Sequence, residues 1–80
     1  MYYVYLIRST KDPSKTYIGY TIDLDQRMEK HNNGASIYTS DDRPWVLVTY
    51  VVFSEQSKAI EFEKYLKIGS GHAFAKRRFW

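Results

Sequence analysis

The chain has 80 residues, no cysteine, and 12 Lys and Arg against 9 Asp and Glu, which gives a formal net charge of +3. This length predicts one domain over residues 1–80 with a thin core, since such a short chain buries only about 60–65% of its unfolded surface. The absence of cysteine excludes disulfides, thiolate zinc sites and cysteine nucleophiles. No apolar run reaches the roughly 18 residues that cross a bilayer, and no basic region precedes the apolar N-terminus. We therefore expect no membrane association and a cytoplasmic location, with an anionic partner permitted but not required.

Two N-terminal segments are predicted to pair as antiparallel strands. Residues 2–8, "YYVYLIR", alternate between two faces, and "TYIGY" returns after the turn "KDPS". Pairing with Tyr5 opposite Tyr17 would place Tyr3, Tyr5, Tyr17 and Gly19 on one surface. Because glycine weakens a strand, Gly19 indicates a close approach to the backbone, which we expect to come from a bound ligand or the first helix.

A first helix is predicted in "DLDQRMEKHNNG", which carries apolar side chains at helical spacing. Asp23 is the expected N-cap and Asn33-Gly34 the expected stop. Arg27 and His31 are four residues apart, so they project from one side of this helix.

The second half of the chain predicts a strand, a helix and a tail. After a polar loop over residues 35–44, "WVLVTYVVF" has the aromatic and β-branched content of a strand buried on both faces. Ser54 is expected to start a helix with the apolar stripe Ala59, Phe62, Glu63 and Leu66. "GSG" is expected to end it, followed by a basic, aromatic tail with a final helical turn or two, in which His72 is a surface residue.

Glu63 is the unexpected member of that stripe. Burying an unpaired carboxylate costs several kcal/mol, so Glu63 needs a cation, hydrogen-bond donors or water. Either it is a boundary residue paired with Lys67, four residues on, or it has a metal-binding or catalytic role. Tyr5 and Tyr17 leave a similar choice between a structural aromatic pair and a catalytic pair.

The ordered set of these residues resembles a known family. "YVYLI", then Tyr17 in "YIG" twelve residues after Tyr5, then Arg27, His31 and a late glutamate in "KAIEFEKYLK" resemble the GIY-YIG nuclease superfamily. The ending "LKIGSGHAFAKRRF" is similar to that of its small bacterial stand-alone proteins, and the chain is also similar to the N-terminal nuclease domain of excinuclease C. The resemblance covers essentially the whole chain. It implies an α+β domain with a central three-stranded antiparallel sheet flanked by helices.

The resemblance also implies roles for the matching residues. Tyr5 and Tyr17 match the tyrosines of the two motifs, and Arg27 the arginine of the first helix. His31 matches a position filled by histidine or tyrosine, and Glu63 the ligand of a single Mg²⁺ or Mn²⁺ ion. A tyrosine base has an ordinary pKa of about 10, so it needs a nearby positive charge, while the planar guanidinium suits a phosphate clamp.

Three positions depart from the family's pattern. Tyr3 and Val4 replace the glycine and isoleucine of the first motif, and Tyr20 stands where some active members carry a lysine.

We expect an endonuclease that hydrolyses DNA at branched, flapped or damaged structures, because a lone domain has little surface for reading sequence. The alternatives are a catalytically weak nucleic-acid-binding module and a subunit that acts with a partner protein or as a homodimer. Substrate contacts are expected at Gly19, Lys76, Arg77 and Arg78.

Overall fold

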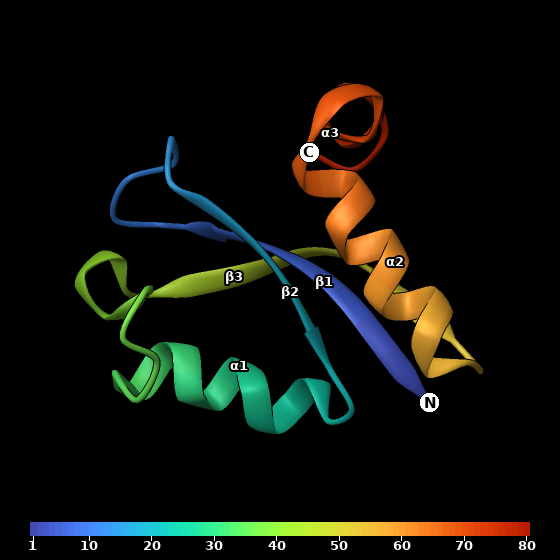
Figure 1. Cartoon of the computed structure of the whole chain (residues 1–80). Coiled ribbons are helices and arrows are strands. Elements are labelled where there is room, and N and C mark those ends of the chain that lie inside the picture. The colour runs from blue at the N-terminus through green and yellow to red at the C-terminus, as the bar shows by residue number, and fades with distance from the viewer.

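A three-stranded sheet with helices on both faces makes up the fold. The computed structural model describes residues 1–80, and its elements in chain order are β1 (Tyr2–Ser9), β2 (Thr16–Thr21), α1 (Leu24–Asn33), the 3-10 turn η1 (Ser40–Asp42), β3 (Trp45–Phe53), α2 (Gln56–Lys67) and α3 (Gly69–Arg78). The sheet is antiparallel in the order β2-β1-β3, with α1 on one face and α2 and α3 on the other (Figure 1). The expected α+β fold is confirmed. None of the helices combines the length and apolarity needed to cross a bilayer.

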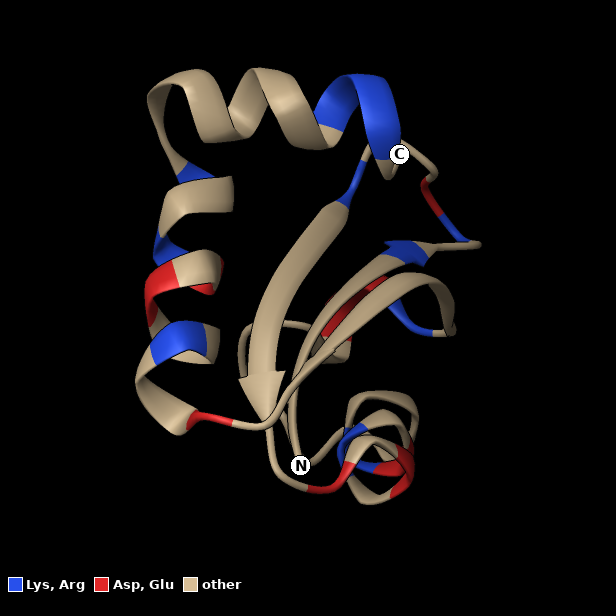
Figure 2. Cartoon of the chain, turned by 90° about the vertical axis from the view of Figure 1, so that its right-hand side faces the viewer, with Lys and Arg blue, Asp and Glu red and all other residues tan.

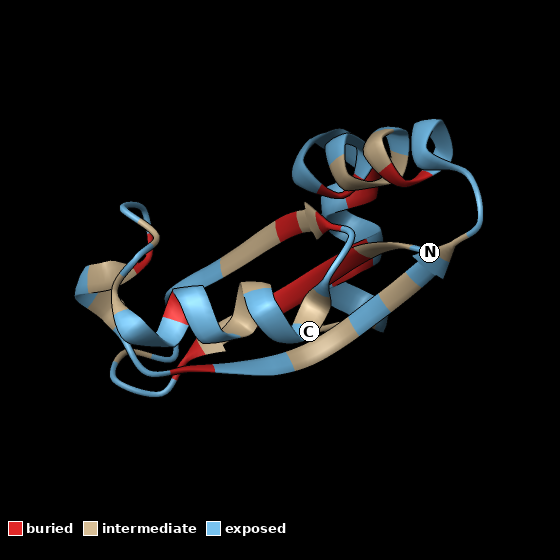
Figure 3. Cartoon of the chain, turned by 90° about the horizontal axis from the view of Figure 1, so that it is seen from below, coloured by how far each residue is buried: buried red, intermediate tan, exposed pale blue.

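The central strand β1 supplies most of the core. Val4 and Leu6 pack toward α2 and α3, whereas Tyr5 and Ile7 pack toward α1, and all four are 0% exposed. Because side chains alternate along a strand, one short segment anchors two small cores, one on each face of the sheet. The buried band along this strand is visible in Figure 3.

The β1–β2 register differs from the expected one by two residues. Tyr5 lies opposite Gly19, and Ile7 lies opposite Tyr17. An even shift leaves every side chain on its face, so Tyr3, Tyr5, Tyr17 and Gly19 still share one surface. The group that approaches Gly19 is the ring of Tyr5, which a Cβ at position 19 would overlap. The substrate contact expected at Gly19 is corrected accordingly, because the glycine is buried and Tyr5 fills the space above it.

β3 is an edge strand, and the prediction that it is buried on both faces is wrong. It pairs only with β1. Trp45 is buried, but Val46, Leu47, Tyr50 and Val52 are 39–50% exposed. Aromatic and β-branched residues suit any pleated strand, so composition could not distinguish an edge from a central position.

The start and stop signals of α1 are confirmed. The Asp23 carboxylate accepts a hydrogen bond from the Gln26 amide at 3.0 Å, and Gly34 ends the helix with a left-handed φ of 87°. α2 begins at Gln56, two residues after the expected Ser54, and its N-cap Glu55 makes no side-chain capping bond.

The segment after α2 is a ten-residue helix, α3, which is longer than the final helical turn or two that we expected. Gly69 adopts a left-handed φ of 53°, and a Cβ at Gly71 would overlap the Tyr65 carbonyl. α2 ends at Lys67, just before "GSG" as expected, and the glycines also build a close turn into the next helix. α3 carries Lys76, Arg77 and Arg78 in its last turn (Figure 2).

Candidate active site

A buried hydrogen bond between Tyr5 and His31 forms the centre of the candidate site. The phenol oxygen lies 2.8 Å from His31 Nε2, and both residues are 0% exposed. Tyr5 comes from the central strand, and its ring passes over Gly19 to reach this position. His31 comes from the last turn of α1, so it is part of the interior and not a solvated helix flank.

Thr39 holds the opposite side of the imidazole. Its Oγ1 lies 2.8 Å from His31 Nδ1, and its carbonyl accepts a hydrogen bond from Trp45 Nε1 at 2.8 Å. Thr39 is 1% exposed. Because both ring nitrogens have a partner, the orientation of the imidazole is fixed. Sequence reasoning missed Thr39, which lies in a polar loop and carries no motif.

Burial controls the protonation of this pair. Desolvation raises the pKa of Tyr5 to about 12; the positive charge of Arg27 opposes this rise, and Tyr17 and Glu63 add to it. Desolvation, followed by the charge of Arg27, lowers the pKa of His31. At neutral pH Tyr5 is therefore a phenol and His31 a neutral imidazole, with one nitrogen donating and the other accepting.

Tyr17 extends the cluster toward the edge of the sheet. Its ring centroid lies 6.3 Å from that of Tyr5 and 5.3 Å from that of His31. The Lys67 ammonium lies 5.9 Å from the same centroid. Because β2 is an edge strand with α1 and α2 on its two sides (Figure 1), α2 side chains can reach around it to Tyr17.

Glu63 forms an ion pair with Lys67, which is the first of the two alternatives predicted for Glu63. The carboxylate oxygen lies 3.0 Å from the ammonium, and the side chains are 19% and 44% exposed. A pair of this kind on a helix surface contributes only about 0.3–0.5 kcal/mol, so it leaves room for another role. Arg27 from α1 and Glu63 from α2 both act on the pKa of Tyr5. The structure thus brings Tyr5, Tyr17 and His31 into contact, and Arg27 and Glu63 lie near enough for their charges to act on Tyr5.

The chain matches a known protein family over nearly its whole length. The family described as "GIY-YIG catalytic domain" matches residues 1–76 of the chain. The chain belongs to the GIY-YIG family. The UPF0213 protein SSP2268 of Staphylococcus saprophyticus, 39% identical over 67 residues, is matched over 82% of this chain and 79% of that protein. The solution NMR structure of the UPF0213 protein BH0048 from Bacillus halodurans matches with a TM-score of 0.58 and 27% identity, covering 99% of this chain and 87% of that one.

Larger relatives share the GIY-YIG segment alone. The structure-specific endonuclease subunit slx1 of Talaromyces marneffei is 41% identical over 68 residues, and subunit SLX1 of Candida dubliniensis is 36% identical over 83. The matches cover 78% and 95% of this chain but only 18% and 28% of those proteins. The rest of each relative has no counterpart in these 80 residues.

A metal ion in this GIY-YIG site would have few protein ligands. No group of three or more His, Asp or Glu side chains is arranged to hold a metal. Mg²⁺ keeps several waters and is commonly bound by one or two carboxylates together with substrate phosphates. Glu63 already accepts a cation, the Lys67 ammonium, at 3.0 Å. The donor set therefore fits an open, one-carboxylate site and does not fit a closed metal cage.

The remaining predicted residues lie outside this cluster. Lys76, Arg77 and Arg78 are exposed on the last turn of α3.

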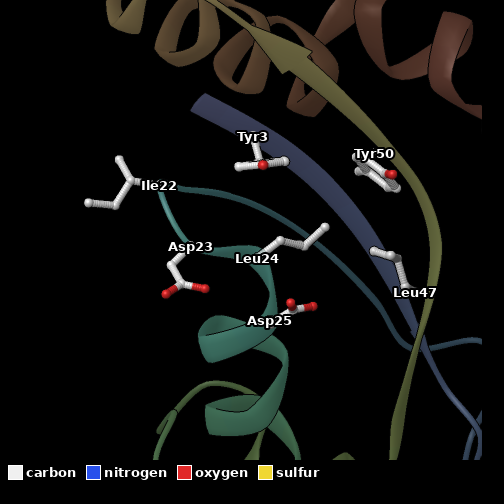
Figure 4. A pocket seen from close by; sticks show the side chains of 7 residues that line it. All are labelled: Tyr3, Ile22, Asp23, Leu24, Asp25, Leu47 and Tyr50. Atoms are coloured by element: carbon white, nitrogen blue, oxygen red, sulfur yellow. The ribbon is translucent and has the colours of Figure 1, made fainter. Parts of the chain in front are cut away.

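The largest cavity, about 390 Å³, also lies outside the cluster, between the sheet and the start of α1 (Figure 4). It is lined by Tyr3, Ile22, Asp23, Leu24, Asp25, Leu47 and Tyr50. Its apolar walls and two carboxylates do not suit a phosphate.

Proposed function

We propose that this chain is a metal-dependent endonuclease that hydrolyses phosphodiester bonds in DNA at branched, flapped or damaged structures. The observation that carries the proposal is the Tyr5–His31 hydrogen bond, with the charges of Arg27 and Glu63 acting on the same phenol. Membership of a family described as a catalytic domain supports it, as do relatives named structure-specific endonuclease subunits.

Proton transfer is the task of the buried pair. The Tyr5 oxygen is buried, so this proposal requires DNA binding to admit the attacking water to it. As that water attacks the phosphorus, one of its protons passes to the Tyr5 oxygen, and the phenol proton passes to His31 Nε2. This relay never requires a free phenolate, which the raised pKa of Tyr5 disfavours. In this proposal the ring proton is on Nδ1, which donates to Thr39 Oγ1 2.8 Å away and leaves Nε2 as the accepting nitrogen.

Charge neutralisation is the task of the two residues beside the phenol. The Arg27 guanidinium has the planar geometry to hold two phosphate oxygens. Glu63 would hold one Mg²⁺ or Mn²⁺ ion, which supplies charge neutralisation on the phosphoryl and leaving oxygens when bound.

The substitution Glu63→Gln tests the proposal. Mg²⁺-dependent cleavage of labelled branched and flapped DNA should fall at least about 10²- to 10³-fold, the usual effect of losing one transition-state contact. Stability should change by less than about 0.5 kcal/mol, because an exposed ion pair contributes little. Glu61→Gln, an exposed glutamate on the same helix, is the matched control and should cut normally. A Glu63→Gln protein that melts early yet cuts normally would end the assignment.

A subunit that needs a partner is the second candidate. The exposed apolar side chains of the β3 edge favour it, because monomers rarely leave such an edge uncovered. The relatives named as subunits support it as well. Sedimentation over a range of concentrations, alone and with DNA, tests for a second copy, and a lack of cleavage by the pure protein would favour a different partner.

A further inference from the structure

A second cavity opens beside the candidate active site, between β2, the end of α2 and α3. It has a volume of about 280 Å³ and is lined by Thr16, Tyr17, Ile18, Lys67, His72 and Trp80. Tyr17 and Lys67 belong to the site described above, whereas His72 and Trp80 do not. We propose that this cavity binds one unpaired nucleotide of the DNA strand next to the scissile phosphate. The inference rests on the proposed nuclease function and names the substrate feature that the site recognises.

The polar lining of the cavity suits an anion. Lys67 contributes an ammonium on a side chain that is 44% exposed, and His72 contributes an exposed imidazole. Thr16 adds a hydroxyl group, and no Asp or Glu side chain lines the cavity, although Glu63 pairs with Lys67. Imidazole, ammonium and hydroxyl groups are all donors to phosphate oxygens.

The aromatic lining suits a planar ring. Tyr17 and Trp80 lie in the same cavity, and the Arg8 guanidinium lies 5.4 Å from the Trp80 ring centroid. The indole therefore already packs against a planar cationic group, which adds positive charge beside the cavity. A bare anion would leave the two rings unused, and an acidic peptide would use them poorly. A phosphate joined to a base uses both parts of the lining.

The size and position of the cavity determine which nucleotide can enter. Its volume of about 280 Å³ is just below the roughly 300–1,000 Å³ of typical small-ligand pockets, so it admits no more than one nucleotide. A base inside a duplex is stacked on its neighbours and cannot present its face to protein rings. Only an unpaired nucleotide fits, and a flap or branch point supplies one beside a duplex. Tyr17, shared with the active site, places that nucleotide next to the phosphate to be cut.

Binding measured in EDTA tests the inference without cleavage. The probes are a short oligothymidylate, the abasic deoxyribose-phosphate chain of the same length, and a blunt duplex. Tryptophan fluorescence reports on Trp80, because Trp45 is only 4% exposed and packs on the opposite face of the sheet. We expect saturable quenching by the oligothymidylate, and binding about 5- to 150-fold weaker for the abasic chain, the effect of losing one stacked base. The blunt duplex should not quench.

Two variants locate the signal. His72→Ala should weaken oligothymidylate binding about fivefold or more, and its exposed side chain can be removed without unfolding the domain. Lys58→Ala, an exposed cation at the start of α2, is the control and should bind like the wild type. Trp80→Phe keeps a ring but should abolish the quenching. Equal affinity for the abasic chain, quenching by the duplex, or an unchanged His72→Ala protein would overturn the inference.

The outcome separates this inference from the proposed function. Mg²⁺-dependent cleavage without quenching would overturn the nucleotide subsite and leave the nuclease assignment intact. Quenching with the expected His72→Ala effect, but without cleavage by any preparation, would support the subsite on a nucleic-acid-binding module and overturn the nuclease.

Discussion

Single residues determine the chemistry of this site, and only some of their positions and contacts could be predicted from the sequence. The spacing of Arg27 and His31 placed both on one side of a helix, and the structure directs that side to Tyr5. Thr39 escaped prediction because its role depends on where a loop returns, which no local pattern encodes. Gly19 was recognised as a close approach, but its neighbour was misassigned because the strand register was two residues off.

Thr39→Val tests whether the threonine hydroxyl supports the imidazole. Valine keeps the shape but leaves His31 Nδ1 buried without a partner, so the free energy of unfolding should fall by about 1–3 kcal/mol. Thr39→Ser keeps the hydroxyl and should lose less. Urea denaturation measures the stability of both variants. A valine variant as stable as the wild type would show that the hydrogen bond contributes nothing.

The pair Tyr5–His31 also predicts how stability depends on pH. The pKa of His31 is lowered by folding, so the unfolded chain binds more protons, and stability should decline as the pH falls below about 6.5. The pKa of Tyr5 is raised to about 12, so stability should decline again as the pH rises from about 10. Melting temperature against pH measures both limbs. Tyr5→Phe should flatten the alkaline limb, whereas His72→Ala should leave the acid limb in place.

At the level of elements, local signals located α1 and β3, but they gave neither the burial of β3 nor the full length of α3. Capping and stop residues fix α1 within its own sequence. The burial of β3 depends on sheet order, which places β1 at the centre. "GSG" carries the local signature of a helix end, and α2 does end just before it, but the contact of Gly71 with Tyr65 in that helix has no local signal.

Alanine substitutions in that turn test the two glycine roles. Gly71→Ala forces a Cβ into the Tyr65 carbonyl, and because backbone cannot move aside cheaply, the cost should reach or exceed about 3 kcal/mol. Gly69→Ala meets no neighbouring atom, so only its left-handed φ matters, at about 1–2 kcal/mol. Denaturant unfolding should rank Gly71→Ala as the more damaging change. The reverse order would mean that backbone conformation, and not close packing, limits the turn.

At the scale of the whole molecule, basic side chains and the apolar cavity with its carboxylates lie on different parts of the surface. Tyr5, Arg27 and Glu63 come from a strand and two helices that only the tertiary fold unites. Their convergence could be expected from the family resemblance but not from periodicity or composition. The end of α3 is basic (Figure 2), whereas the cavity beside β3 has apolar walls and two carboxylates (Figure 4). A nucleic acid is therefore expected on the β2 and α3 side.

Neutralising the basic end of α3 tests that orientation. Lys76, Arg77 and Arg78 form no ion pair within the chain, so their charges are available to phosphates. Replacing all three with alanine should weaken DNA binding for every sequence. The slope of log affinity against log salt should become shallower by up to roughly 0.9 for each phosphate that the variant no longer neutralises. Titration of labelled duplex and flapped DNA at several salt concentrations measures both effects.

The control for this triple variant must carry the same net charge. Replacing the exposed cations Lys30, Lys58 and Lys64 removes three charges from α1 and α2. If α3 contacts the phosphate backbone, this control should lose less affinity and keep more of the salt slope, because long-range charge effects are screened beyond about 10 Å at 0.1 M salt. Equal losses in the two variants would mean that net charge alone steers the DNA. No loss in the α3 variant would place the binding surface on another part of the molecule.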